Sequence, residues 1–135
     1  MSRLLGYSRR VVIAAPEYLA RHGTPEHPND LKKHAGIVWT GGREGARWRL
    51  QLSSGIEIVD VSGPLTTDNV ATANAAVAAG AGIGIAQHWQ VQELLAQDRC
   101  TLLLTQYEPP PLPIHVIWPP VNHLPRRTHV ATSIF

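Results

Sequence analysis

The sequence is poor in cysteine, in long apolar runs and in recognisable catalytic patterns. Its single cysteine, Cys100, excludes an intrachain disulfide, and a chain without disulfides suits a reducing compartment. No apolar run approaches the about 18 residues that a membrane helix needs, and no apolar core with a cleavage site stands at the N-terminus. We therefore expect a cytoplasmic protein without a membrane partner.

Metal-binding and catalytic spacings are missing as well. His22, His27 and His34 lie along one loop at irregular spacing, without cysteine or paired carboxylates, which favours a solvated loop over a zinc site. The serines lack a nucleophile elbow, and the carboxylates occur singly. The glycine-rich run 80–84 follows an expected helix, the reverse of a dinucleotide-binding loop. The sequence therefore predicts no enzyme, no metal and no cofactor, and we expect Cys100 to be a half-buried, inert thiol.

What the chain does contain is a globular balance of residues. Hydrophobic residues make up 44% of its 135 residues and charged residues 16%, which predicts one domain with a buried core. The formal charge is +2, and the basic residues are scattered as isolated pairs that form no stripe. We therefore expect no direct DNA contact by these residues.

Apolar runs separated by glycine and proline predict alternating strands and helices. The expected strands are 11–15, 37–40, 56–61, 83–86, 101–107 and 114–118, with an alternating segment from Trp48 that forms a hairpin with 56–61 around the turn Ser53-Ser54-Gly55. The expected helices are 17–22, 70–79 and 88–97, and a last helix opens at 124–135. Trp89, Leu94 and Leu95 are the residues of 88–97 that we expect to point inward. This order predicts an α/β layered fold.

The segment 62–85 is the most informative part of the chain. Asp68 or Thr67 is expected to cap the alanine-rich helix 70–79, and Gly80 ends it. The start of that helix, with its free backbone amides, is suited to receive a carboxylate or another anion.

The order of these segments resembles the LysR-type transcriptional regulators. The matching phrases are RVVIAAPEYLARHG at 10–23, Asp30-Leu31, Trp39-Thr40, Gly63-Pro64-Leu65 with Asp68-Asn69, Ala78-Ala79-Gly80 with Gly82-Ile83-Gly84-Ile85, Pro111-Leu112-Pro113-Ile114, and LPRRTHV at 124–130. The resemblance implies an α/β, type II periplasmic-binding-protein-like effector domain. It places a second lobe at 16–108, crossover strands at 9–15 and 113–119, and the start of the closing helix at 124–135.

The same resemblance implies the partners. It suggests a small-molecule effector, DNA contact only through a winged helix-turn-helix head that this chain lacks, and a homodimer or homotetramer. A free-standing solute-binding protein of the same fold is the alternative, against which the missing signal peptide counts. A remnant that folds only as a dimer is a further alternative.

Family precedent puts the effector at the carboxyl ends of the strands, in agreement with the general rule for open α/β sheets. Carried onto this sequence, the expected ligand-binding residues are Trp39, Thr40, Thr67, Asp68, Asn69, Gln87 and His88. Asp68 is read first as a helix cap and Trp39 first as a core anchor, while Thr67 and Asn69 are the better ligand contacts. Gln87 and His88 depart from the apolar residue and proline usual in the family, and our hypothesis is that this pair hydrogen-bonds the effector.

Overall fold

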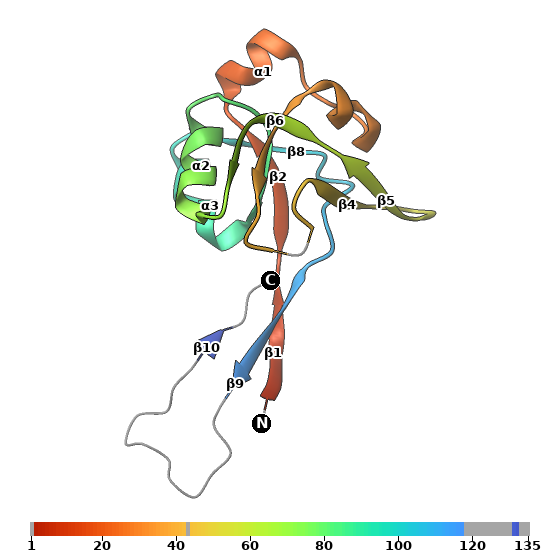
Figure 1. The fold of residues 1–135 in the computed structure, drawn as a ribbon, viewed down its shortest axis with the longest axis vertical. Coiled ribbons are helices and arrows are strands. Elements are labelled where there is room, and N and C mark those ends of the chain that lie inside the picture. Colours follow the sequence, from red (N-terminus) through yellow and green to blue (C-terminus); the bar gives the residue numbers. More distant parts are fainter. Residues whose placement is uncertain (1, 43, 118–130, 133–135) are drawn as a thin grey trace, which may run out of the picture.

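The computed structural model describes residues 2–42, 44–117 and 131–132 and consists of an α/β body with a narrow arm of strands projecting from it (Figure 1). The strands are β1 (Ser2–Ser8), β2 (Arg10–Ala14), β3 (Ala35–Trp39), β4 (Arg47–Leu52), β5 (Gly55–Asp60), β6 (Ser62–Thr67), β7 (Gly84–Gln87), β8 (Thr101–Leu103), β9 (Leu112–Ile117) and β10 (Ala131–Thr132). The helices are α1 (Pro16–His22), the 3-10 helix η1 (Pro28–Lys33), α2 (Val70–Ala78) and α3 (His88–Ala96). Among these helices, none is long and apolar enough to cross a membrane.

The body is built on one mixed sheet. Strand β2 pairs antiparallel with both β7 and β8, and β3 pairs in parallel with β6. A parallel bridge between Gly36 and Ile83 joins the two groups, with hydrogen bonds of 2.8 Å from the Ile37 amide to the Ile83 oxygen and from the Ile83 amide to the Ala35 oxygen. The strand order is therefore β8-β2-β7-β3-β6, with β2 running against the rest. The carboxyl ends of the other four strands consequently meet at the edge where β2 begins.

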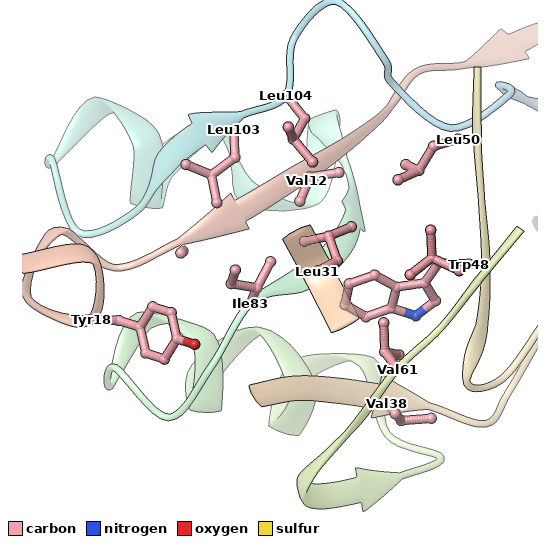
Figure 2. Packing of buried hydrophobic residues seen from close by; sticks show 12 residues of the cluster. Val12, Tyr18, Leu31, Val38, Trp48, Leu50, Val61, Ile83, Leu103 and Leu104 are labelled. Atoms are coloured by element: carbon pink, nitrogen blue, oxygen red, sulfur yellow. The ribbon is translucent and has the colours of Figure 1, made fainter. Parts of the chain in front are cut away.

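Each face of this sheet carries its own apolar core. Successive side chains of β2 point to opposite faces, so Val12 joins one core and Val11 the other. The first core, drawn in Figure 2, packs Tyr18 of α1, Leu31 of η1 and the hairpin residue Trp48 against the sheet. Each fully buried aliphatic side chain of this kind stabilises the fold by about 1.5–3 kcal/mol.

The second core lies under α2 and α3. Val77 of α2 is 1% exposed and Val91 of α3 is 0% exposed. Cys100 belongs to this core and is 3% exposed, more deeply buried than the half-buried thiol expected from sequence. Because burial disfavours the thiolate, the pKa of Cys100 is raised above its ordinary value.

The hairpin of β4 and β5 confirms the alternation read from the sequence. Leu52 pairs with Gly55 across the Ser53-Ser54 turn, and Trp48 and Leu50 face the core. The opposite face of the hairpin carries Arg47, Arg49 and Ile58.

The arm joins segments from opposite ends of the chain. Strand β1 pairs antiparallel with β9 from Ser2 opposite Ile117 to Ser8 opposite Leu112, and β10 pairs with the other edge of β9. Of the two segments expected as crossover strands, 9–15 and 113–119, the residues that the structure describes do not pair with each other, since β2 belongs to the sheet of the body. Their role as crossover strands stays a prediction.

Several local expectations need correction. The helix expected at 124–135 is a strand at its two described positions, Ala131–Thr132, and its other residues lie outside the described ones. The strand expected at 101–107 ends at Leu103, because Leu104 has φ 51° and its oxygen closes a turn with the Tyr107 amide at 2.8 Å. Trp89 is 54% exposed instead of inward, because Val91 and the partly buried Leu94 and Leu95 form the inner face of α3.

Candidate functional site

A cavity of about 420 Å³ opens where the carboxyl ends of the strands meet the hairpin. Trp39 and Gln87 line it from the ends of β3 and β7, and Val70, Ala73 and Asn74 line it from one side of α2. Hairpin residues form the opposite wall: Arg47, Trp48, Arg49 and Ile58. The cavity therefore lies at the edge of the sheet where the general rule for open α/β sheets places a ligand.

Two of the seven residues expected to bind ligand line this cavity, namely Trp39 and Gln87. Trp39 is half-buried, packs against the second core and donates its indole N–H to the Asp68 oxygen at 2.9 Å. It is therefore a core anchor and a wall of the cavity at once. The Asp68 carboxylate does not contribute to this hydrogen bond.

The other five expected residues lie beside the cavity without lining it. The Thr40 amide donates to the Thr67 oxygen at 2.8 Å, and the Thr67 hydroxyl accepts from the Asn69 amide at 3.1 Å. His88 opens α3, and its amide donates to the Arg9 oxygen at 2.8 Å.

The cap of α2 is Asn69, which corrects the expectation of Asp68 or Thr67. Its side-chain oxygen accepts from the Thr72 amide at 2.9 Å. Asn69 has φ −99° and ψ 118°, the extended conformation of a residue just before a helix. The end of the helix is exposed at this point, so it opens to solvent and not into either core.

Gln87 is a buried polar residue in the lining of the cavity. It is 6% exposed, and its Oε1 accepts from the Ser8 hydroxyl at 2.8 Å and from the Trp89 indole at 3.0 Å. An indole N–H can only donate, so this contact fixes which end of the carboxamide faces Trp89. Among the described residues the Gln87 amino group has no hydrogen-bond partner, and none of their buried side-chain atoms is both sealed from solvent and unsatisfied. The amino group of Gln87 is therefore a donor with access to the cavity.

Arg10 and Glu44 form an ion pair in the cavity wall. Arg10 donates from Nη1 to Oε2 of Glu44 at 3.1 Å and from Nη2 to Oε1 at 3.3 Å, while its Nε donates to the Pro110 oxygen at 2.8 Å. The exposed fractions of the two side chains are 11% and 27%. Sequence reasoning missed both residues. The sequence feature that could have indicated Arg10 is its position as an arginine at the start of an otherwise fully apolar strand.

The lining carries an excess of positive charge. Among the described residues, its charged members are Arg10, Arg47 and Arg49 against one carboxylate, Glu44. Arg47 pairs with Asp60 at 3.3 Å, but both side chains are more than 70% exposed, so this pair is strongly screened. The electrostatics of the cavity therefore favour an anion.

Away from the cavity, one polar cluster joins α1 to the start of β3. The Tyr18 oxygen accepts from the Ala35 amide at 3.2 Å and lies 2.9 Å from Nδ1 of His34. Burial, together with the nearby His22, lowers the pKa of His34 below its ordinary value, and Asp30 opposes the shift. In the part of the chain that the structure describes, no three histidine, cysteine or acidic residues are grouped to hold a metal ion.

The fold is that of a type II periplasmic-binding-protein-like effector domain. The sequence matches the LysR substrate binding domain over residues 2–132, and the chain belongs to this family. Members of the family are transcriptional regulators.

Individual relatives agree with this assignment. The chain is 36% identical over 96 residues to the HTH-type transcriptional regulator YcaN of Escherichia coli K12, covering 71% of this chain and 31% of YcaN. The CrgA regulatory domain of Neisseria meningitidis is 27% identical with a TM-score of 0.68, covering 81% of this chain and 56% of that one. The full-length Vibrio cholerae virulence activator AphB has a TM-score of 0.77 at 22% identity, covering 85% of this chain and 39% of AphB, a likeness of fold. The chain spans less than half of the length of the curated relatives it matches, for example 31% of one and 44% of another.

Proposed function

We propose that this chain is the effector-sensing part of a LysR-type regulator and that its cavity binds a small anionic molecule. The observation that carries the proposal is the cavity itself, which combines the Trp39 ring, the free donor of Gln87 and an excess of arginine at the ligand-binding edge of the sheet. A flat or apolar ligand body would pack on Trp39, and its negative charge would be balanced by the arginines.

The position of the cavity supports a role in signalling. Arg10 begins β2 directly after the arm strand β1, and Pro110, which accepts its Nε hydrogen bond, lies just before the arm strand β9. A ligand that contacts Arg10 therefore acts where both arm strands leave the body. Ligand binding would bias the angle between the body and whatever the arm carries, which is the usual form of hinge coupling.

The partners of the whole regulator are part of the same proposal. The arm exposes large apolar side chains, with Leu5 60% and Tyr7 64% exposed, which supports contact with further protein in the longer regulator. We propose that the regulator forms a homodimer or homotetramer and contacts DNA through a separate helix-turn-helix head.

A thermal-shift panel on this chain tests the ligand site. The panel pairs small carboxylates, aromatic and aliphatic, with their neutral carboxamides. Some carboxylates should raise the melting temperature, because a ligand that binds only the folded state stabilises it, and the matched carboxamides should raise it less.

Two tryptophan substitutions on α2 locate the binding. Asn74→Trp fills the cavity and should abolish the shift, whereas Ala75→Trp adds the same ring on the exposed side of the helix and should preserve it. A shift that survives Asn74→Trp, or no shift across the panel, contradicts the proposed function.

A further inference from the structure

The guanidinium of Arg10 is held firmly on one side and loosely on the other. Its contact with the Pro110 oxygen is 2.8 Å, but its two contacts with Glu44 are 3.1 and 3.3 Å. The neighbouring Arg9 also makes two hydrogen bonds to a carboxylate, from its Nε and Nη2 to Glu108 at 2.9 and 2.7 Å. Close arginine–carboxylate pairs have donor–acceptor distances of about 2.7–2.9 Å. The hydrogen bonds from Arg10 to Glu44 are longer than this and therefore weaker.

Gln87 supplies a second donor at the same place. Residues 10 and 87 are direct partners in the antiparallel ladder of β2 and β7, so their side chains leave the sheet on the same face. Both side chains line the cavity. The Gln87 oxygen is turned toward Ser8 and Trp89, which leaves its unpartnered amino group as the end of the carboxamide available to the cavity.

We propose that Arg10 and Gln87 form a carboxylate subsite inside this cavity, and that the Glu44 side chain occupies the Arg10 half of it until a ligand carboxylate displaces it. The inference rests on the proposed function of the cavity and names its ligand class, a small carboxylic acid. The ligand carboxylate would accept from the Nη atoms of Arg10 with one oxygen and from the Gln87 amino group with the other. Glu44 alone leaves that amino group without a partner.

Glu44 then acts as a built-in competitor. A carboxylate tethered to the same chain competes at a high effective concentration, so ligand binds only to the fraction of molecules in which Arg10 is released. The pair sets a threshold concentration for the effector. Asp60 is the other carboxylate on this side of the hairpin, and it pairs with Arg47 and not with Arg10.

Isothermal titration calorimetry of the chain with sodium benzoate tests the subsite, with benzamide as the neutral probe. Glu44→Gln removes the competitor and should tighten benzoate binding at least about tenfold, the scale of one charge-assisted hydrogen bond. Asp60→Asn removes the same charge from the same neighbourhood and should change the affinity less than about twofold, since exposed pairs are screened. Benzamide affinity should not rise in either variant.

A second substitution in the Glu44→Gln background isolates the Gln87 donor. Gln87→Glu keeps an oxygen to accept from Ser8 and Trp89 but replaces the amino group with negative charge. It should abolish the gain in benzoate affinity. The melting temperature of each variant shows whether it is folded.

The outcomes separate this inference from the proposed function. Equal benzoate affinity in Glu44→Gln and Asp60→Asn overturns the competitor role of Glu44, and an unchanged gain after Gln87→Glu overturns the subsite. Either result leaves the proposed function intact if the panel finds ligands that Asn74→Trp excludes. A gain in Glu44→Gln with no ligand in the panel supports the subsite and contradicts the sensing function.

Discussion

Trp89 donates its indole N–H to Oε1 of Gln87 over 3.0 Å, although the tryptophan is 54% exposed and the glutamine only 6%. An exposed aromatic residue thus holds the orientation of a buried carboxamide. The hydrogen bond explains why a large apolar side chain lies on the outer face of α3, where it contributes little to the core. Its role is to position Gln87, and that role is testable.

Replacing Trp89 with phenylalanine removes the indole donor and leaves an aromatic ring. Only the Ser8 hydroxyl would then hold the Gln87 carboxamide, and a hydroxyl can accept as well as donate, so the amino group would be less firmly directed to the cavity. We expect benzoate affinity in the Glu44→Gln background to fall about three- to tenfold, the equivalent of about 1 kcal/mol for one hydrogen bond. The melting temperature should change little because the ring is exposed. Unchanged affinity, measured by the same calorimetry, would refute the positioning role.

The cap of α2 gives a second prediction. Asn69→Ala removes the acceptor of the Thr72 amide and should lower the free energy of unfolding by about 1 kcal/mol. Asp68→Ala is the matched control, since its carboxylate takes no part in the cap, and it should cost much less. Urea denaturation followed by circular dichroism compares the two, and a larger loss for Asp68→Ala would contradict the observed cap.

The close approach of β3 and β6 gives a third prediction. A Cβ added at Gly63 would overlap the carbonyl oxygen of Gly36, which is backbone and cannot rotate away. Gly63→Ala should therefore destabilise the fold by about 1–3 kcal/mol or more, as overpacking does in a close-packed interior. Ser62→Ala, at the exposed neighbouring position, should be nearly neutral. A fall in melting temperature for Ser62→Ala as large as that for Gly63→Ala would argue against this packing.

His34 predicts a pH dependence of stability. Its pKa is lowered in the folded state, while an unfolded chain has a histidine pKa of about 6.5. Below that pH the unfolded chain takes up the proton first, so the contribution of His34 is present above about 6.5 and is lost as the pH falls through its lower folded pKa. Urea midpoints measured from pH 7.5 down to 5 should fall less steeply for His34→Gln than for the wild type. A slope for His34→Gln parallel to that of the wild type would rule the explanation out.

Much of the body could be predicted because its signals are local. Strand β2 is a continuous apolar run before a proline, and the hairpin alternates polar and apolar residues around a glycine turn. The start of α2 at Val70 was predicted correctly, but its capping residue was not, since Asp68 and Asn69 are both good caps and only the backbone geometry distinguishes them. The strand β1 was missed because it contacts no core and its burial pattern is almost entirely exposed.

The residues of the candidate site could be predicted only where a local sequence pattern, such as the end of a strand, marks them. Trp39 and Gln87 stand at strand ends, which a sequence can mark. Arg10 and Glu44 are 34 positions apart and meet through the fold of the β3–β4 connection, and no local pattern joins them. The sequence likewise could not predict that Trp89 points to solvent, because this depends on which side of α3 packs on the sheet.

One feature of the arm reaches beyond this chain. Because β1 and β9 run side by side, the segment between Arg9 and Pro110 begins and ends at neighbouring points of the structure. Such a unit can be spliced into a surface turn of a host protein through two adjacent attachment points. In a fluorescent host protein that carries this insert, exchange of Glu44 for a ligand carboxylate at Arg10 would shift the two attachment points. The fluorescence of the host would then report the concentration of the acid.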